Sequence, residues 1–362
     1  MLLFILRVDI NIEQSYKLQE TFYVLMKATT ISLFFVCLFL LNSCSEKTGQ
    51  DSFLSQLRQD SLLMKNVQKM QRIKAKDIII EKDFLYDQYT LQDTYPYRDT
   101  TRQFQWEKIK QGLAILENFQ QEFFAWGILQ NYRNNNGEAP LVKKYKRNEY
   151  KRIADTLGVE RFQGIPLFLP TDTVTGERYG RDGALVKLFK DNVGSFRKIT
   201  TTDSKELWLV PQKYVKPIHD TVQFKHAIFV DRNNENIVTL EKVDKKWIVR
   251  SMNPATTGLH KPPYQQETPL GLFVLQEKKV KMFFLVDGTT ETGGFAPYAN
   301  RFTNGGYIHG IPVNAPSTTF IEYSPSLGTI PRSHMCVRNA TSHAKFVYDW
   351  APTEETIIFV IE

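Results

Sequence analysis

The segments Tyr307-Ile308-His309-Gly310 and Ser333-His334-Met335-Cys336-Val337-Arg338 decide how the C-terminal part of this 362-residue chain is interpreted. The first is strand-like, and the second places a lone thiol beside a histidine and an arginine. A thiol attacks a carbonyl only as its thiolate, so a reactive cysteine needs a nearby base or cation. The pattern therefore predicts a cysteine nucleophile with an imidazole base, and either histidine is a candidate for that base.

Strand-like segments surround this pair from residue 225 onward. They are short, rich in β-branched and aromatic residues, and separated by turn sequences such as Asp231-Arg232-Asn233-Asn234. The expected strands cover residues 226–230, 236–243, 246–251, 270–276, 281–286, 307–309, 318–323 and 356–361. The pattern predicts an antiparallel β-sandwich or barrel, interrupted by one helix that Ser342 caps and Pro352 follows.

The histidine and cysteine segments resemble the catalytic motif of L,D-transpeptidases, which are wall-crosslinking enzymes with a β-rich, YkuD-type catalytic domain. Three further segments agree in order with that family. Residues 267–273, Glu-Thr-Pro-Leu-Gly-Leu-Phe, resemble its Thr-Pro-x-Gly strand, residues 297–302 its segment before the histidine, and residues 357–361 its closing strand. The resemblance spans about 225–362 and implies an L,D-transpeptidase β-sandwich there.

The resemblance also implies roles for single residues. Cys336 would be the nucleophile, His309 its general base, and the main-chain carbonyl of Gly310 would orient the imidazole. The turn residues Ser333, His334 and Met335 would shape the oxyanion pocket. Arg338 would stabilise the loop or meet a substrate carboxylate, and Tyr298 would help to cover the substrate or would serve only in packing.

The implied substrate is a peptidoglycan stem peptide, and no cofactor is expected. The cysteine would attack the carbonyl of the third, diamino acid residue, release the terminal D-alanine through a thioester, and pass the acyl group to an amine for crosslinking or anchoring. Water as the acceptor would instead give an L,D-carboxypeptidase. A non-catalytic wall-binding lipoprotein and a cysteine peptidase remain alternatives, whereas a zinc site lacks the paired ligand spacing of closed sites.

Two features depart from the family pattern. Met335 stands where the family has glycine, which adds a side chain to a tight turn and would be strained if the turn needs a positive φ. The insert between His309 and Ser333 is longer than usual and contains four prolines, so we expect a lid or a specificity loop there.

The N-terminal part of the chain has an export pattern. Lys27 precedes an apolar run over 28–41, and Leu41-Asn42-Ser43-Cys44 resembles a lipobox. We therefore expect lipidation at Cys44, translation from Met26 with residues 1–25 as an over-extended start, and a lipid-anchored location on the periplasmic side of a membrane. The alternative is an uncleaved signal anchor. Cys336 would then be the only free thiol of an exported chain, where cysteines are usually paired.

Between the anchor and the catalytic segments, we expect a helical region over 45–160 and a small SH3-like β unit over 161–220. Apolar residues at helical spacing predict a helix over 104–132, capped by Thr100 or Thr101, and a weaker helix over 51–75. Residues 207–218 resemble the closing strands of SH3-like barrels. The catalytic domain is expected over 221–362.

The charge of the chain excludes little. A formal net charge of +7 is moderate for 362 residues, so we interpret it as compatibility with anionic partners and not as a nucleic-acid signature. The sequence gives no indication of the oligomeric state.

Overall fold

The computed structural model describes residues 72–121, 125–202, 204, 206–219 and 221–362. The expected signal segment, the lipidation residue Cys44 and all but the last residues of the weak helix over 51–75 lie outside this part of the chain. In the described part, no helix has both the length and the apolar character needed to cross a lipid bilayer. The architecture is mainly β, with two α-helices among the described residues. This agrees with the expectation for the C-terminal part, whereas the described residues of the expected helical region over 45–160 form six short strands and only one α-helix.

A six-stranded sheet forms the base of the C-terminal domain, with the strand order β1-β15-β14-β13-β22-β16. Its strands are β1 (Ile79–Lys82), β13 (His226–Asp231), β14 (Asn236–Val243), β15 (Lys246–Pro254), β16 (Gly271–Val274) and β22 (Thr356–Ile361). A second sheet has the order β17-β18-β19-β21, with β20 paired to β18. Its strands are β17 (Glu277–Leu285), β18 (Thr292–Thr303), β19 (Gly306–His309), β20 (Val313–Asn314) and β21 (Val337–Arg338).

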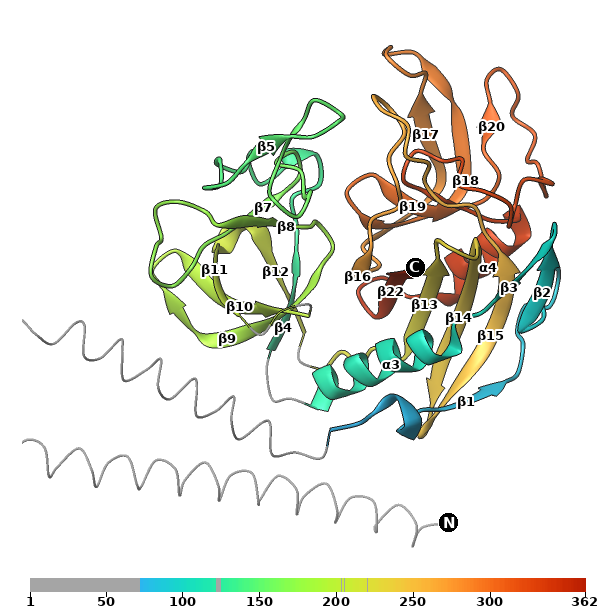
Figure 1. Cartoon of the computed structure of the whole chain (residues 1–362), viewed down its shortest axis with the longest axis horizontal. Coiled ribbons are helices and arrows are strands. Elements are labelled where there is room, and N and C mark those ends of the chain that lie inside the picture. The colour runs from blue at the N-terminus through green and yellow to red at the C-terminus, as the bar shows by residue number, and fades with distance from the viewer. Residues whose placement is uncertain (1–71, 122–124, 203, 205, 220) are drawn as a thin grey trace, which may run out of the picture. The chain divides into compact units, whose positions relative to one another are not determined.

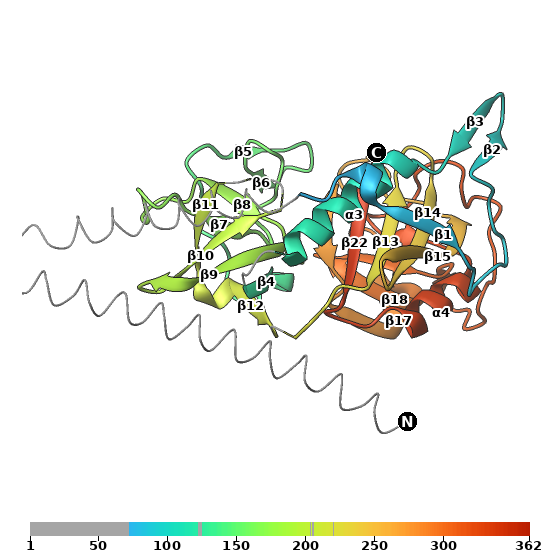
Figure 2. The ribbon, with the colours of Figure 1, turned by 90° about the horizontal axis from the view of Figure 1, so that it is seen from below.

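The six-stranded sheet is covered on both faces (Figures 1 and 2). Side chains alternate along a strand, so Phe229 and its neighbours on one face of β13 pack against α3 (Trp106–Gln121), whereas Ile228 and Val230 face the second sheet and α4 (Thr341–Trp350). The domain is therefore a sandwich with α3 on the outer face of the six-stranded sheet and α4 packed, with the second sheet, against its inner face.

The sheets are mixed, and the expectation of an antiparallel sandwich or barrel is wrong for three strand pairs. β13 pairs in parallel with β22, β1 with β15, and β19 with β21. Parallel neighbours need long crossover connections, and such partners cannot be identified from the alternation within a single strand. β1 lies about 165 residues before its partner, and it brings the expected helical region into the catalytic sheet.

The residues before α3 also contact the C-terminal domain through a ribbon of β2 (Thr94–Tyr97) and β3 (Thr100–Gln103). Arg102 on this ribbon donates to the carbonyl of Gly328 at 2.5 Å, and the Tyr95 hydroxyl donates to that of Asn234 at 2.8 Å. A short 3-10 helix, η1 (Ala75–Asp77), precedes β1. Thr100 and Thr101 lie in β3 and do not cap α3, so that prediction is wrong.

The predicted helix over 104–132 is correct only to Gln121. After the undescribed residues 122–124 the chain forms β4 (Ala125–Leu129), which pairs with two strands far away in sequence. The apolar residues of β4 continue the helical spacing of α3, so local spacing did not distinguish the strand from more helix. The turn η2 (Tyr132–Asn134) follows it.

A β unit over 125–218, which we call the inserted unit, follows α3 and precedes β13 in the sequence. Its sheet has the order β11-β10-β9-β4-β12. These strands are β4, β9 (Leu185–Val193), β10 (Phe196–Thr201), β11 (Leu207–Pro211) and β12 (Val215–Ile218), with the 3-10 helix η3 (Gln212–Tyr214) between the last two. Two ribbons cover one end, β5 (Lys146–Arg147) with β6 (Ile153–Ala154) and β7 (Ile165–Leu167) with β8 (Arg178–Gly180).

The insert over 310–332 does not contain the strand expected at 318–323. The carbonyl of Ile321 accepts from the Thr341 hydroxyl at 2.6 Å, and that of Glu322 accepts from the Thr341 N–H at 2.8 Å. The carbonyl groups of this extended segment thus accept hydrogen bonds from Thr341 at the start of α4 and do not pair with a neighbouring strand. Ala340 occupies the cap position of α4, so the expected cap at Ser342 is also wrong.

Candidate active site

One cavity of about 530 Å³ lies against the second sheet. Five of the residues selected from the sequence line it, namely His309, Ser333, His334, Cys336 and Arg338. The rest of the lining is mostly apolar and comes from β17 and the start of the insert. It consists of Met282, Phe284, Leu285, Asp287, Ala296, Ile311, Pro312 and Asn314. The segments over 307–310 and 333–338 therefore meet at one cavity.

The pairing of β19 with β21 brings these segments together. The strands are parallel and place Ile308 opposite Val337 and His309 opposite Arg338. Ile308 and Val337 are fully buried in the core between the sheets. Because side chains alternate along a strand, His309 and Arg338 lie on the other face, where the cavity is.

The imidazole of His309 is held by its own chain. Its Nδ1 donates to the carbonyl of Gly310 at 2.6 Å. A carbonyl can only accept, so the proton resides on Nδ1, and Nε2 is the nitrogen left to act as a base. Gly310 must remain glycine, because a Cβ there would lie 2.7 Å from Thr341 Oγ1 and 2.9 Å from Pro297 Cγ.

The thiol of Cys336 is buried, with 8% of the residue exposed. It donates to the carbonyl of Gly305 at 3.5 Å, in the turn between β18 and β19. Burial raises the pKa of Cys336 to about 11, against which a hydrogen bond from the Tyr307 main chain acts. Burial lowers the pKa of His309 to about 4, and the Gly310 carbonyl opposes this shift. Near pH 7 the resting pair is therefore neutral thiol and neutral imidazole.

The turn before the cysteine is in a left-handed conformation. Met335 has φ of +79°, in the region that favours glycine. Two buried hydroxyls hold this turn. Ser333 Oγ donates to the carbonyl of Cys336, and Thr268 Oγ1 donates to that of Met335 at 2.8 Å while accepting from Gly258 N at 2.9 Å. The strain at Met335 is thus offset by contacts on both sides of it.

The rim of the cavity carries charge. His334 Nε2 lies 2.9 Å from Asp287 Oδ2, and both side chains are a little under half exposed. Arg338 is held through its main chain by Thr256, at 2.8 and 2.9 Å, while its Nε is buried and has no hydrogen-bond partner among the described residues. Burial lowers the pKa of Arg338, and a carboxylate brought into the cavity would supply the missing acceptor.

Tyr298 is not part of the cavity lining. It has φ of +50° and packs against Phe320 and Tyr348, with ring centroids 5.7 and 5.8 Å away. These contacts join β18, the insert and α4, so the structure gives this side chain a packing role.

Several residues at the site were not selected from the sequence. Thr268 belongs to the segment that resembles the Thr-Pro-x-Gly strand but had no predicted role, and no motif contains Asp287 or Gly305. The Asn304-Gly305 pair is a strong hairpin signal, with φ of +37° at Asn304, and could have identified the turn beneath the thiol. Asp287 carried no such signal. In the described part of the chain, no three His, Cys, Asp or Glu residues are grouped in a way that could hold a metal ion.

Comparison with known proteins agrees with the motif. Residues 225–360 match the L,D-transpeptidase catalytic domain family, YkuD. Among solved structures, an L,D-transpeptidase from Mycobacterium smegmatis is 17% identical over 50% of this chain and 93% of that chain, with a TM-score of 0.31. L,D-transpeptidase 3 from Mycobacterium tuberculosis is 16% identical over 51% and 93%, with a TM-score of 0.30.

A fused Zn-dependent amidase/peptidase/peptidoglycan-binding domain protein from Clostridium acetobutylicum is 20% identical over 38% of this chain, with a TM-score of 0.28. The match spans only 51% of that protein's chain. No curated protein sequence matches this chain.

Proposed function

On the premise that residues 225–360 belong to the L,D-transpeptidase catalytic domain family, we propose that this protein is a peptidoglycan L,D-transpeptidase with a cysteine nucleophile. The observation that carries the proposal is the cavity that Cys336 and His309 line together, in which Gly310 fixes the imidazole through Nδ1. The proposed substrate is a tetrapeptide stem of peptidoglycan.

In the proposed reaction, Cys336 Sγ forms a bond with the carbonyl carbon of the third, diamino acid residue while His309 Nε2 takes the thiol proton. The C–N bond to the terminal D-alanine then breaks, and the imidazolium returns the proton to the leaving amine. The product is a thioester on Cys336. An amine of a neighbouring stem attacks this thioester, forms the new amide and releases the thiol.

The resting protonation states limit when the proton moves. With a pKa of about 11 for the thiol and about 4 for the imidazole, transfer of the proton from the thiol to the imidazole is unfavourable in the empty cavity. The transfer is therefore proposed to take place during the attack itself, when the developing oxyanion and the bound substrate stabilise the charges.

The turn over 333–336 is the proposed oxyanion site. Successive main-chain N–H groups in a turn of left-handed conformation can converge on one anion. Arg338, whose Nε lacks a partner, is proposed to bind a carboxylate of the stem peptide. His334, paired with Asp287, is proposed to shape the mouth of the cavity.

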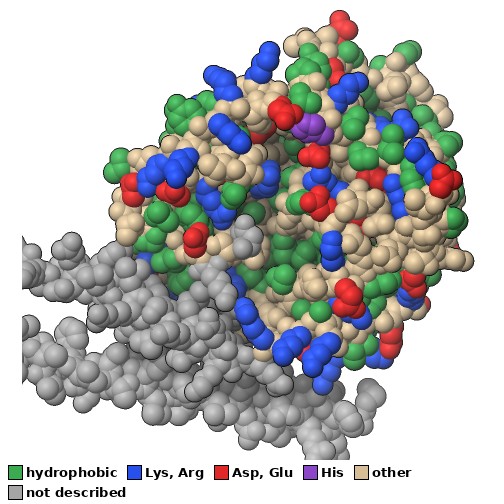
Figure 3. Space-filling model, in the orientation of Figure 1, with side chains coloured by type: hydrophobic (Ala, Val, Ile, Leu, Met, Phe, Trp, Pro, Cys, Tyr) green, Lys and Arg blue, Asp and Glu red, His purple; other side chains and the backbone are tan. Residues whose placement is uncertain are grey.

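We extend the proposal to the rest of the chain from its sequence. Cys44 is proposed as a lipidation site that holds an exported protein on the periplasmic side of a membrane. The inserted unit is proposed to be SH3-like, an interpretation supported by five strands with a 3-10 helix, η3, between the last two. Basic and acidic side chains are interspersed on the face drawn in Figure 3.

The test is product analysis on a disaccharide-tetrapeptide. The full chain and its Cys336→Ala and His309→Gln variants are incubated with this substrate, and the products are resolved by mass. His260→Gln is the matched control, because His260 pairs with Glu149 at 2.8 Å and does not line the cavity. We expect crosslinked dimer from the wild type and the His260 variant, and none from the other two.

Two other outcomes correct the proposal. Tripeptide without dimer would assign water as the acceptor and make the protein an L,D-carboxypeptidase. Unchanged substrate with every variant, together with no carbapenem adduct on Cys336, would refute an enzymatic function and favour a wall-binding role.

A further inference from the structure

We propose that Asp182 of the inserted unit is a positioning residue for the Cys336 thiol. It fixes the turn between β18 and β19, and the Gly305 carbonyl of that turn accepts a hydrogen bond from the thiol. The inference rests on the proposed function for its catalytic consequence, whereas its effect on the thiol is measured independently of any reaction.

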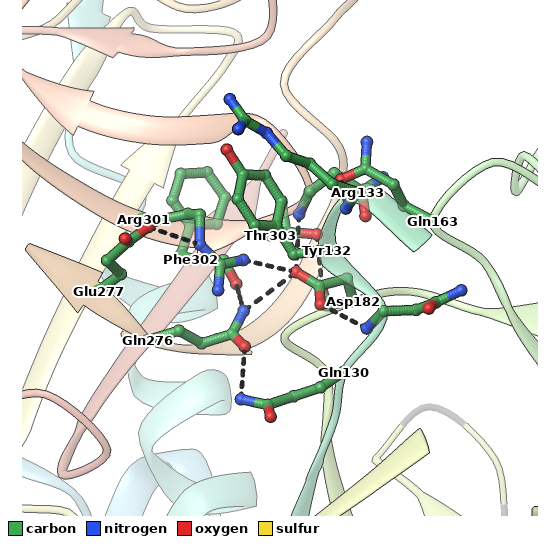
Figure 4. A network of polar contacts seen from close by, with 12 residues as sticks. Gln130, Tyr132, Arg133, Gln163, Asp182, Gln276, Glu277, Arg301, Phe302 and Thr303 are labelled. Carbon is green, nitrogen blue, oxygen red and sulfur yellow. Dashed lines mark hydrogen bonds and ion pairs between the residues drawn. The ribbon is translucent and has the colours of Figure 1, made fainter. Parts of the chain in front are cut away.

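Asp182 joins the inserted unit to the catalytic domain through a buried carboxylate (Figure 4). The side chain is 0% exposed and lies between β8 and β9. Its Oδ1 accepts from the Asn131 N–H at 2.8 Å, within the inserted unit. Its Oδ2 accepts from Arg301 Nη1 at 2.7 Å, from Gln276 Nε2 at 3.2 Å and from the Asn304 N–H at 3.0 Å, all in the catalytic domain. Oδ1 thus binds the inserted unit, and Oδ2 binds the catalytic domain.

Within the catalytic domain, Asp182 contacts the tight hairpin turn of Asn304 and Gly305. The carboxylate holds the Asn304 N–H, and the main-chain carbonyl of Asp182 accepts from Thr303 Oγ1 at 2.6 Å. The two residues that precede Gly305 are therefore both bound by Asp182. A two-residue hairpin has few conformations, so fixing its first half also fixes the direction of the Gly305 carbonyl.

That carbonyl is the acceptor for Cys336 Sγ at 3.5 Å. The contact joins the inserted unit to the thiol in two steps, from Asp182 to the turn and from the turn to the sulfur. A carbonyl oxygen stabilises a thiol, which can donate to it, and destabilises a thiolate, which cannot. The turn therefore holds the sulfur in one orientation and keeps it protonated until a substrate arrives.

Further contacts at the junction bring the inserted unit and the catalytic domain close together and continue to Tyr307. A Cβ on Gly183, which has φ of +84°, would lie 1.8 Å from the carbonyl oxygen of Phe302, so only glycine fits beside the strand. The guanidinium of Arg301 lies over the Tyr132 ring at 4.3 Å and contacts Glu277 at 3.3 Å. Glu277 in turn lies 3.3 Å from the hydroxyl of Tyr307, the residue that packs beside Cys336.

The test compares Asp182→Asn with two other variants. The substitution keeps the shape of the side chain but removes the charge that binds Arg301 and the Asn304 N–H. Thr303→Val removes one hydroxyl from the same turn and leaves all charges in place. Asp155→Asn is the matched control. Asp155 is a buried carboxylate of the inserted unit that accepts from three main-chain N–H groups at 2.9 Å and contacts neither the turn nor the cavity.

The readout is the pH profile of Cys336 alkylation by iodoacetamide in the full chain, well below each variant's unfolding midpoint. The tryptic peptide 333–338 is quantified by mass, so that Cys37 and Cys44 do not interfere. In Asp182→Asn we expect the alkylation midpoint to fall by about one pH unit and the rate at pH 7.5 to rise about tenfold, because the rate follows the thiolate fraction. Thr303→Val should shift in the same direction by less, and Asp155→Asn should match the wild type.

Turnover should change in the opposite direction. With disaccharide-tetrapeptide, kcat of Asp182→Asn should fall about tenfold with KM unchanged, since the thiol is more exposed but worse placed. An alkylation profile of Asp182→Asn equal to that of the wild type, or one that Asp155→Asn reproduces, overturns the proposal. A wild type with the expected profile but no product would refute the proposed function and leave the positioning role supported.

Discussion

The hydroxyl of Thr268 gives a quantitative prediction about the oxyanion turn. Thr268 is fully buried, and its Oγ1 accepts from Gly258 N at 2.9 Å and donates to the Met335 carbonyl at 2.8 Å. Thr268→Val keeps the shape of the side chain and leaves both partners unpaired. Each unpaired buried group costs about 1–3 kcal/mol, and the Met335 carbonyl belongs to a half-buried residue that water can approach. We therefore expect a loss of about 3 kcal/mol in the free energy of unfolding.

The same substitution should affect chemistry. The Met335 carbonyl and the Cys336 N–H belong to one planar peptide unit, so the Thr268 hydroxyl that fixes the carbonyl also fixes the N–H. That N–H is a proposed oxyanion donor, and loss of one such donor typically lowers kcat by about 10²–10³-fold. We expect acylation of Cys336 in Thr268→Val to fall by about 10²-fold.

The assay pairs urea denaturation with the rate of carbapenem acylation measured by intact mass. Thr268→Ser is the control, since it keeps the hydroxyl and loses only a methyl group, at about 1 kcal/mol. The reasoning predicts that serine restores most of the acylation rate. Equal stabilities and equal rates for the valine and serine variants would refute it, because the hydroxyl would then contribute neither stability nor alignment.

Three further predictions concern the site and its support. Met335→Gly should keep the free energy of unfolding, measured in urea, within about 0.5 kcal/mol of the wild type, because relief of the strain at φ +79° and the added freedom of the unfolded chain nearly cancel. Met335→Val should lose about 1–2 kcal/mol, and similar values for both variants would show that the turn is unstrained. Wild-type Cys336, with a pKa of about 11, should react with iodoacetamide at pH 7.5 about 10²-fold more slowly than free cysteine, and a rate equal to that of free cysteine would contradict the buried, protonated resting state. Burial raises the pKa of Glu235 to about 7, so between about pH 4.5 and 7 the native state holds a proton that the unfolded state has lost, and the stability of the wild type falls with rising pH. In urea titrations across this window, the stability of Glu235→Gln relative to the wild type should therefore rise by up to about 3 kcal/mol. A difference that does not depend on pH would show that the carboxyl group titrates normally.

The central strands could be predicted from the sequence because their patterns are local. β14 and β22 have the predicted bounds, since the first five residues of each are buried and both strands are rich in β-branched residues. The positions of His309 and Cys336 in one cavity followed from motif order. Each of these features depends on residues that are adjacent in sequence or on a recognisable pattern.

Features that depend on distant partners could not be predicted. The spacing of apolar residues in β4 predicts a continuation of α3. Its partners, β9 and β12, lie 56 to 93 residues further along the chain, and they supply the burial that makes β4 a strand. Residues 318–323 have strand-like composition, but the start of α4 takes their carbonyl groups. The role of Asp182 depends on a junction between two units, and no spacing along the chain indicates it.

The position of β22 in the six-stranded sheet has a consequence for synthesis of the protein. β22 lies between β13 and β16 in the interior of the sheet, although its partner residues in β13 precede it by about 130 residues in the chain. β1, made among the first described residues, pairs with β15. Growth of the chain is slow compared with the folding of small units, so the inserted unit can fold while the ribosome is still at work. The catalytic sheet cannot close until β22 has been made and has left the ribosome. We therefore expect the site to form only after β22 has been added, and a chain that stops before β22 to lack a stable cavity.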